Sequence, residues 1–189
     1  MVAARDPETD EAFSDEQLGD QVSTMILAGH ETTATALFWS LYLLALDPAT
    51  QDELAAEARS ARASGSFDAA KLTFTRAVID EAMRLYPPVA IIDRIATTDI
   101  DLGDAQIKKG DLAFALIYIM HRHKKLWDNP ELFDPDRFSE ARARAIPRFQ
   151  YMPFGAGPRI CIGMKFAYME AVAILATLVR ALRFLPNPA

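Results

Sequence analysis

Apolar positions recur at helical spacing through the first quarter of the chain and predict one long helix. Ser14-Asp15-Glu16-Gln17 has the pattern of a capping box, in which the Ser hydroxyl and the Gln side chain satisfy free backbone amides at a helix start. Apolar residues then follow every three or four positions from Leu18 to Leu41, and Asp47-Pro48 ends the pattern. At a rise of roughly 1.5 Å per residue, this helix approaches the diameter of a whole domain. We therefore expect it to cross the centre of the protein.

Further along, the pattern predicts shorter helices and strands and then one long loop. Helices are expected over 49–63 and 75–86, the second ending at two prolines, with a Ser-Gly-Ser turn at 64–66 between them. Residues 121–151 carry no regular pattern, and a final helix is expected over 161–182. Short strands are expected at 90–97, 100–102, 105–107 and 112–119.

The middle of the long helix is polar, although the turns on either side of it are apolar. Gly29-His30-Glu31-Thr32-Thr33 places a glycine, a carboxylate and two hydroxyls there, and glycine and threonine both weaken a helix. A threonine hydroxyl can bond to a carbonyl one turn earlier, which favours a local bulge. One interpretation is a small pocket that binds a polar molecule and delivers protons. The other is a solvated helix face with incidental threonines.

Composition fits a single globular domain and argues against several classes of protein. The 189 residues are 51% hydrophobic, which is enough for a sizeable core. A formal net charge of −6 argues against a dedicated nucleic-acid binder, and the longest apolar stretches are shorter than a membrane span. One cysteine permits no intrachain disulfide, and the acidic N-terminal stretch has no signal-peptide pattern. These features favour a cytoplasmic protein with no nucleic-acid partner and no membrane span.

The one cysteine lies in a glycine-rich run that suits a thiolate bound to haem iron. The run is Phe154-Gly155-Ala156-Gly157-Pro158-Arg159-Ile160-Cys161-Ile162-Gly163, at the start of the expected final helix. Loop amides and the positive end of the helix dipole can stabilise a thiolate, the glycines let the backbone approach it closely, and Phe154 can shield it from water. The alternative for a lone cysteine is an inert buried thiol, and the flanking residues argue against it.

A zinc site is a rival interpretation of the metal-binding side chains. His121 and His123 form a His-x-His pair, and His30 and Cys161 would complete a set of four zinc ligands. The pair lies in a basic stretch, and the chain has no second cysteine. We therefore favour the haem interpretation.

Four motifs in a fixed order make the chain similar to the C-terminal part of the cytochrome P450 family, the haem-thiolate monooxygenases. The resemblance implies a mainly α fold with small β-sheets, namely the C-terminal portion of the P450 fold of a bacterial-type soluble member. It also implies one partial domain over 1–189, incomplete at both ends, without the family's N-terminal half and C-terminal closing strands. The motifs are Ala28-Gly29-His30-Glu31-Thr32-Thr33, Glu81-x-x-Arg84, Pro135-Asp136-Arg137-Phe138 and Phe154-x-x-Gly157-x-Arg159-x-Cys161-x-Gly163.

The resemblance assigns a role to each motif. Cys161 would be the axial ligand of the iron in haem b, iron protoporphyrin IX, and thiolate donation favours cleavage of an O–O bond. Glu31 and Thr32 would deliver protons to dioxygen, so that one oxygen leaves as water. Glu81, Arg84 and Arg137 would form a buried structural triad, although an acid-x-x-base pair taken alone usually lies at the surface. Residues implied to contact the haem are Ala28, Gly29, Arg94, His121, Phe154, Gly155, Arg159 and Gly163, with the two arginines and the histidine holding its propionates.

The implied activity is insertion of one oxygen atom of O2 into a small apolar organic substrate. Electrons derived from NAD(P)H would come from a separate ferredoxin- or flavodoxin-type protein. An acidic partner of this kind would dock by charge complementarity on a set of basic residues of this chain. The alternative is that these basic residues are ordinary solvated charges. The alternative for the whole chain is a truncated, non-catalytic fragment that binds haem weakly or not at all. The basic residues are Arg122, Lys124, Lys125, Arg142, Arg144, Arg148 and Lys165.

Overall fold

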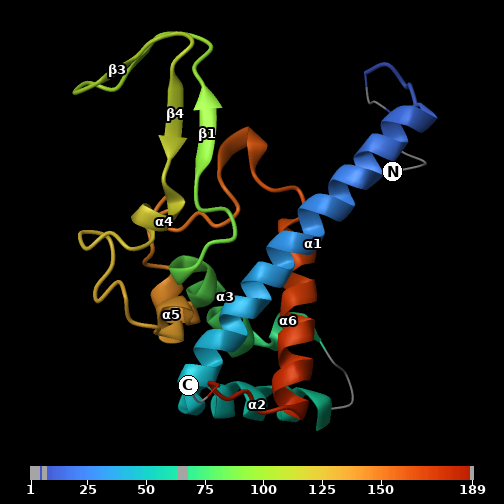
Figure 1. Ribbon diagram of the computed structural model, residues 1–189, viewed down its shortest axis with the longest axis vertical. Helices are drawn as coiled ribbons and strands as arrows, with labels where there is room; N and C mark the ends of the chain where they lie inside the picture. Colours follow the sequence, from blue (N-terminus) through green and yellow to red (C-terminus); the bar gives the residue numbers. More distant parts are fainter. Residues whose placement is uncertain (1–4, 6–7, 64–67, 188–189) are drawn as a thin grey trace.

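Helices make up most of the molecule, and two small antiparallel sheets stand at one end of it (Figure 1). The computed structural model describes residues 5, 8–63 and 68–187. Within these residues the fold is mainly helical with small sheets, as the sequence predicts. The expected turn at 64–66 lies outside the described residues.

The long helix α1 (Asp15–Leu46) is confirmed, and it begins at the predicted capping box. The Ser14 hydroxyl accepts a hydrogen bond from the Gln17 amide at 3.2 Å, and the Gln17 side chain accepts one from the Ser14 amide at 2.9 Å. The second half of α1 packs against other helices, whereas the first half projects beyond them (Figure 1). Its buried positions accordingly start at Thr33.

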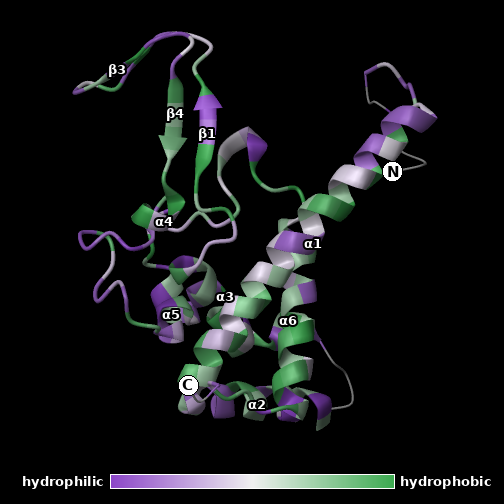
Figure 2. Cartoon of the chain, in the orientation of Figure 1, coloured by the Kyte–Doolittle hydropathy of each residue, from purple (hydrophilic) through white to green (hydrophobic). Residues whose placement is uncertain are grey.

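The core lies where α1 crosses three other helices. These are α2 (Pro48–Ala63), α3 (Thr73–Leu85) and α6 (Met164–Ala181). Figure 2 shows hydrophobic residues along α6, whose buried side places Val172 and Leu175 in the shared core cluster. Burial of this apolar surface is the main force that holds the four helices together. Other buried members of the cluster are Ala36, Leu44, Leu54, Ala58, Leu72, Val78, Ile79, Met83 and Val179.

Helix α3 is the most buried of the four, and it starts two residues before the predicted 75–86. The Glu57 carboxylate of α2 accepts hydrogen bonds from the amides of Phe74 and Thr75 at 2.9 and 2.8 Å. These contacts satisfy amides that are free at a helix start. The capping group therefore belongs to another helix and is not visible in the sequence of α3 itself.

Each of the two sheets is an antiparallel pair of strands. In one, β1 (Ile92–Ile95) pairs with β4 (Leu112–Ala115), and in the other β2 (Ile100–Asp101) pairs with β3 (Gln106–Ile107). All four lie within predicted strands, but the prediction of a strand to residue 119 is wrong. The chain there forms α4 (Ile117–Met120), because Ile117 turns into the interior and is fully buried.

The irregular segment over 121–151 is confirmed apart from two short helices, η2 (Pro135–Phe138) and α5 (Glu140–Ala143). Its conformation depends on Arg84 of α3, which lies beneath it. The Arg84 guanidinium donates hydrogen bonds to the carbonyls of residues 121, 130 and 132 at 2.8, 2.7 and 3.1 Å. A single buried side chain thus satisfies three backbone carbonyls of this segment, beside the turn hydrogen bonds that the segment forms within itself.

The final helix begins at Met164, and the prediction that it begins at Cys161 is wrong. Gly163 occupies the position before the first helical residue, and η3 (Gly157–Arg159) precedes Cys161. The cysteine therefore lies on a loop and outside the first turn of α6.

Candidate functional site

Cys161 lies at the surface on a loop whose ends are joined by a backbone hydrogen bond. The Cys161 amide donates to the Phe154 carbonyl at 3.0 Å. The thiol is exposed, and η3 and the start of α6 flank it in sequence. The sulfur is therefore open to a group from outside the chain.

Glycines allow this loop to form and to pack closely. Gly155 and Gly157 have φ of 73° and 75°, a region that residues with a side chain rarely adopt. A Cβ at Gly155 would also lie 3.3 Å from Cδ1 of Ile92, so the loop fits tightly against β1. A Cβ at Gly163 would lie 3.9 Å from the Cys161 sulfur. Gly163 therefore lies beside the cysteine side chain, at the distance of an ordinary van der Waals contact.

The polar stretch of α1 is regular helix, so the prediction of a bulge there is wrong. The Thr32 hydroxyl donates to the Ala28 carbonyl at 2.8 Å. A carbonyl oxygen has two lone pairs. The Ala28 carbonyl can therefore accept the hydrogen bond from the Thr32 hydroxyl together with the ordinary helical hydrogen bond from a backbone amide. Glu31 is exposed and has no hydrogen-bond or ion-pair partner among the described residues, and a Cβ at Gly29 would meet nothing within 4 Å. This face of α1 is open, and the threonine hydroxyl is already oriented.

The two expected propionate arginines are both exposed. Arg94 lies on β1 opposite Ala113, and its guanidinium donates to the Asp93 carbonyl at 2.6 Å. Arg159 ends η3 and has no hydrogen bond or ion pair within the described part of the chain. Both guanidinium groups are exposed and keep N–H donors for an anionic group, and the contact of β1 with the loop at Gly155 makes their segments neighbours.

His121 does not occupy the position expected of a propionate ligand. Its side chain is fully buried, and Nε2 accepts a hydrogen bond from the Met152 amide at 2.9 Å. Burial lowers the pKa of His121 to about 4, and the nearby positive charges of Arg84 and Arg122 lower it too. A neutral, enclosed imidazole cannot reach a bound carboxylate. The expectation that His121 binds a haem propionate is therefore wrong. His121 instead lies in the interior and holds the segment before the cysteine loop.

Glu81, Arg84 and Arg137 come together in the interior. Arg84 donates to both Glu81 carboxylate oxygens at 2.7 and 2.8 Å, and both side chains are fully buried. The Nε atom of Arg137 lies 3.4 Å from the same carboxylate. Burial raises the pKa of Glu81, while the hydrogen bonds and charge of Arg84 oppose that rise. The group joins α3 to η2 and to the long irregular segment.

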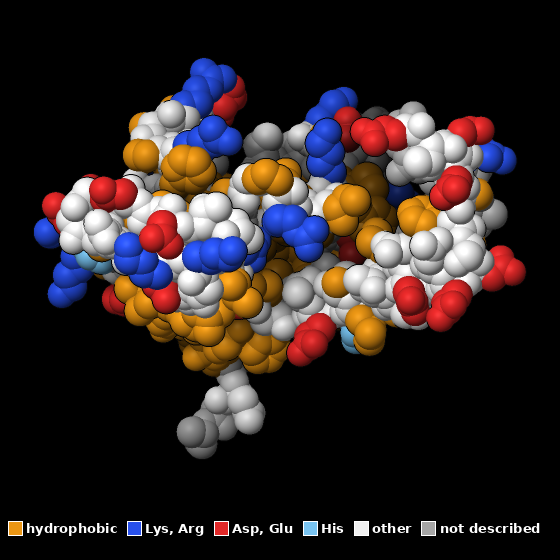
Figure 3. All heavy atoms as spheres, turned by 90° about the horizontal axis from the view of Figure 1, so that it is seen from above, with side chains coloured by type: hydrophobic (Ala, Val, Ile, Leu, Met, Phe, Trp, Pro, Cys, Tyr) orange, Lys and Arg blue, Asp and Glu red, His pale blue; other side chains and the backbone are white. Residues whose placement is uncertain are grey.

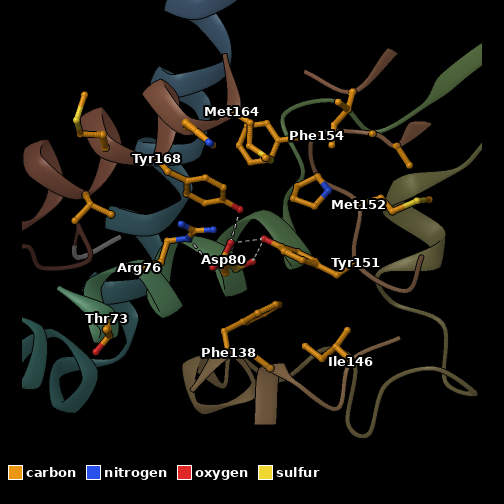
Figure 4. Close-up of a pocket in the computed structure, with 18 of the residues that line it drawn as sticks. Thr73, Arg76, Asp80, Phe138, Ile146, Tyr151, Met152, Phe154, Met164 and Tyr168 are labelled. Carbon is orange, nitrogen blue, oxygen red and sulfur yellow. Dashed lines mark hydrogen bonds and ion pairs between the residues drawn. The ribbon is translucent and has the colours of Figure 1, made fainter. Parts of the chain in front are cut away.

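A second buried carboxylate, Asp80, was not foreseen from the sequence. It accepts hydrogen bonds from the hydroxyls of Tyr168 at 2.6 Å and Tyr151 at 2.9 Å, and from Arg76 Nε at 2.8 Å (Figure 4). Burial raises the pKa of Asp80, and the charge of Arg76 opposes it. The i, i+4 spacing of Arg76 and Asp80 is the only part of this cluster that the sequence displays.

The cluster lines a cavity of about 1240 Å³ between α3, α6 and the 138–157 segment (Figure 4). Phe154, Gly155 and Ile160 of the cysteine loop contribute to its wall, but Cys161, Arg94 and every residue of α1 are absent from it. The cavity therefore lies on a different side of the loop from the expected haem site.

Comparison with known proteins assigns the family. The family model for cytochrome P450 matches residues 1–189, which is the whole chain. The chain belongs to the cytochrome P450 family. One P450 relative, cyclooctatin synthase of Streptomyces melanosporofaciens, is 38% identical over 191 residues, covering 100% of this chain and 42% of that protein. Cytochrome P450 4V2 of Homo sapiens is 38% identical over 173 residues, covering 89% of this chain and 33% of that protein.

A solved P450 has the same fold. The crystal structure of a cytochrome P450 (CYP102L1) matches with a TM-score of 0.91 and 33% sequence identity, over 100% of this chain and 44% of that chain. The predicted fold class is thereby confirmed. The chain spans less than half the length of these P450 relatives. No described helix has the length and hydropathy needed to span a membrane.

P450 membership implies a haem cofactor, and the side chains around Cys161 fit one. An exposed thiol is available as axial ligand, and two exposed arginines are available for carboxylates. Ile162 and Phe166, on either side of the α6 start, are 91% and 63% exposed and offer apolar surface to a macrocycle. Among the described residues, no group of three or more His, Cys, Asp or Glu side chains could hold a metal ion, so the zinc interpretation has no support.

Proposed function

We propose that the chain is the ligand-bearing part of a haem-thiolate monooxygenase. The observation that carries this proposal is Cys161: an exposed thiol on a glycine loop whose Cys161 amide is bonded to the Phe154 carbonyl at 3.0 Å. When bound there, haem b would supply the activation of dioxygen, and a thiolate ligand favours that chemistry. The substrate would be a small apolar organic molecule that receives one oxygen atom.

Residues of the loop and of β1 would hold the cofactor. Arg94 and Arg159 would bind the propionates, since a guanidinium matches a carboxylate with two parallel hydrogen bonds. Phe154 would exclude water from the sulfur, and Gly155 and Gly163 would let the backbone lie close to it. On the opposite side, Ala28 and Gly29 of α1 would leave room for the macrocycle, because neither carries a bulky side chain.

Glu31 and Thr32 would move protons. The Thr32 hydroxyl donates to the Ala28 carbonyl at 2.8 Å, so its oxygen keeps lone pairs free to accept a proton donor from the site. The exposed Glu31 carboxylate can exchange protons with water. Together they form a route by which a proton passes from solvent to the threonine oxygen and then to the reacting oxygen.

A separate acidic redox protein of the ferredoxin or flavodoxin type would deliver electrons. Arg142 and Arg144 are paired with Asp134 and Glu140, which leaves them less free to bind a partner. Arg148 and Lys165, by contrast, have no ion pair among the described residues, and they lie at the cavity beside the cysteine loop. Figure 3 shows Lys and Arg side chains at the surface among large apolar ones, a combination suited to an acidic partner.

We also propose that the protein is cytoplasmic, since its single cysteine permits no intrachain disulfide.

The alternative is a chain that retains the motifs without a working haem site. The exposed apolar side chains on the projecting half of α1 favour this alternative, because an apolar patch of this kind is normally buried against other protein. These side chains are Val22, Met25, Ile26 and Leu27. The two proposals make opposite predictions for haem titration. Saturable binding that weakens in Cys161→Ala supports the first, and non-saturable binding unaffected by that change supports the second.

Isotope labelling tests the reaction itself. The haem-loaded chain, a ferredoxin with its reductase, NADPH and a panel of apolar substrates are incubated under ¹⁸O₂, and products are analysed by mass spectrometry. Monooxygenation requires one ¹⁸O atom per product molecule, with the second appearing in water. Products that carry oxygen only from solvent, or the same yield from Cys161→Ala, would refute the proposal.

A further inference from the structure

One buried carboxylate, Asp80, joins the two ends of the loop that carries Cys161. The Tyr151 hydroxyl lies 2.9 Å from Asp80 Oδ1 and 2.8 Å from the Asp80 carbonyl, and the Tyr168 hydroxyl donates to the same Oδ1 at 2.6 Å. Tyr151 precedes the loop and Tyr168 follows it on α6. Asp80 therefore fixes the distance between the two points at which the loop leaves the body of the protein.

The contact extends from the tyrosine rings into the loop. The Tyr168 ring packs against the Phe154 ring with centroids 4.9 Å apart, and the Phe154 carbonyl accepts the Cys161 amide at 3.0 Å. A shift of Tyr168 would therefore move Phe154, and with it the acceptor that orients the residue carrying the sulfur. Two hydrogen bonds and one aromatic contact thus connect Asp80 to Cys161.

The other end of the loop is held in the same way. The Tyr151 ring lies between the rings of Phe138 and His121, with centroid distances of 4.6 and 5.1 Å. The next residue, Met152, donates its amide to His121 Nε2 at 2.9 Å. The start of the loop is thus held both at the Met152 amide and at the Tyr151 hydroxyl.

Both carboxylate oxygens of Asp80 accept hydrogen bonds from within the protein. Its side chain is 10% exposed, and its second oxygen accepts Arg76 Nε at 2.8 Å. The Arg76 guanidinium lies 3.0 Å from the centre of the Tyr168 ring, and both side chains line the cavity (Figure 4). A buried carboxylate with each oxygen hydrogen-bonded is costly to disturb, which makes it a rigid anchor.

We propose that Asp80, Tyr151 and Tyr168 form a clamp that closes the base of the cysteine loop and sets the position of the Cys161 sulfur. The three are positioning residues, since none of them touches the sulfur. The proposal deepens the proposed function. Only one of its consequences rests on that function, namely that a sulfur held in a fixed position keeps its bond to the haem iron. The geometry of the clamp itself does not depend on haem.

Amide hydrogen exchange of the haem-free chain tests the clamp. The variants Tyr151→Phe and Tyr168→Phe, alone and combined, remove one oxygen each and keep the aromatic packing. We expect the double variant to exchange the Cys161 amide at least about tenfold faster, because it loses both tyrosine hydrogen bonds to the buried carboxylate. Tyr42→Phe is the control, since that ring is exposed on α1 and its hydroxyl has no partner among the described residues.

The pattern of exchange separates a clamp from a general loss of stability. A clamp predicts faster exchange at residues 154–163 and an unchanged rate for Leu175 in the core of α6. Equal acceleration at all slowly exchanging amides, or none at the Cys161 amide, would overturn the proposal. If the double variant does not fold, the two single variants answer the same question, because each removes one of the two tyrosine hydrogen bonds to Asp80.

A second measurement uses the haem-loaded chain. In the double variant we expect a several-fold faster conversion of the reduced carbon monoxide complex from the thiolate-type red-shifted Soret band to the unshifted band of protonated or lost thiolate. A normal conversion rate together with unchanged exchange means that the clamp is wrong while the haem-thiolate assignment stands. Altered exchange in a chain that gives no red-shifted band means that the clamp is right and the proposed function is wrong.

Discussion

Acidification should destabilise this protein through one buried imidazole, His121. The Nε2 atom accepts the Met152 amide at 2.9 Å, and it can do so only while that nitrogen is unprotonated. Burial lowers the pKa of His121 to about 4 in the folded chain. In the unfolded chain the same group titrates near its ordinary pKa of about 6.5.

The size of the effect follows from the difference between these pKa values. Between them the unfolded chain binds more protons than the folded chain, so the free energy of unfolding falls as the pH falls. At about 1.4 kcal/mol per pKa unit, His121 alone removes about 2 kcal/mol by pH 5 and about 3 kcal/mol by pH 4. The carboxyls of Asp80 and Glu81 act in the opposite direction: a pKa raised by burial gives stability that is present at low pH and lost as the pH rises.

Urea denaturation at several pH values between 7 and 4.5 measures this contribution. His121→Gln keeps a side-chain acceptor for the Met152 amide and does not titrate. We expect the wild-type chain to lose about 2 kcal/mol more than this variant between pH 7 and pH 5. His123→Gln, at an exposed histidine two residues away, should follow the wild-type profile. Parallel profiles for wild type and His121→Gln would refute the reasoning.

Three further predictions address the triad, the proton route and the docking surface. Glu81→Ala leaves the Arg84 guanidinium buried without its carboxylate and should lower the free energy of unfolding by about 3–5 kcal/mol in urea titrations; a loss below about 1 kcal/mol would contradict the triad's role. Thr32→Ala should uncouple NADPH consumption from product and raise peroxide yield several-fold, with coupling retained in Thr32→Ser; equal coupling in both would contradict the proton route. Lys165→Glu should raise the KM for an acidic redox partner about tenfold without changing turnover by a chemical reductant, whereas Arg180→Glu, at the far end of α6, should change neither.

The start of α1 was predictable because all of its determinants are local in sequence. The capping box at Ser14 and Gln17 contains both of its hydrogen-bonding partners within four residues. The start of α3 was missed by two residues because its cap is Glu57, on another helix. The predicted bulge near Thr32 failed because the Ala28 carbonyl accommodates the extra hydroxyl within a regular helix.

The candidate site was predictable to the extent that motifs define it. Cys161 and its glycines lie in one short run, and the Glu81–Arg84 pair has helical spacing. Burial is what spacing does not reveal. His121 resembles a surface ligand in sequence but lies in the interior, and Asp80 meets Tyr151 and Tyr168 only after segments 71 and 88 residues apart have packed together.

The carbon monoxide difference spectrum of the reduced, haem-reconstituted chain tests the central claim most directly, because it reports the ligand opposite carbon monoxide. A haem held by the Cys161 thiolate predicts a red-shifted Soret band in the wild-type chain that is absent from Cys161→Ala. An unshifted band in the wild-type chain, or a red-shifted band that persists in Cys161→Ala, would contradict the account.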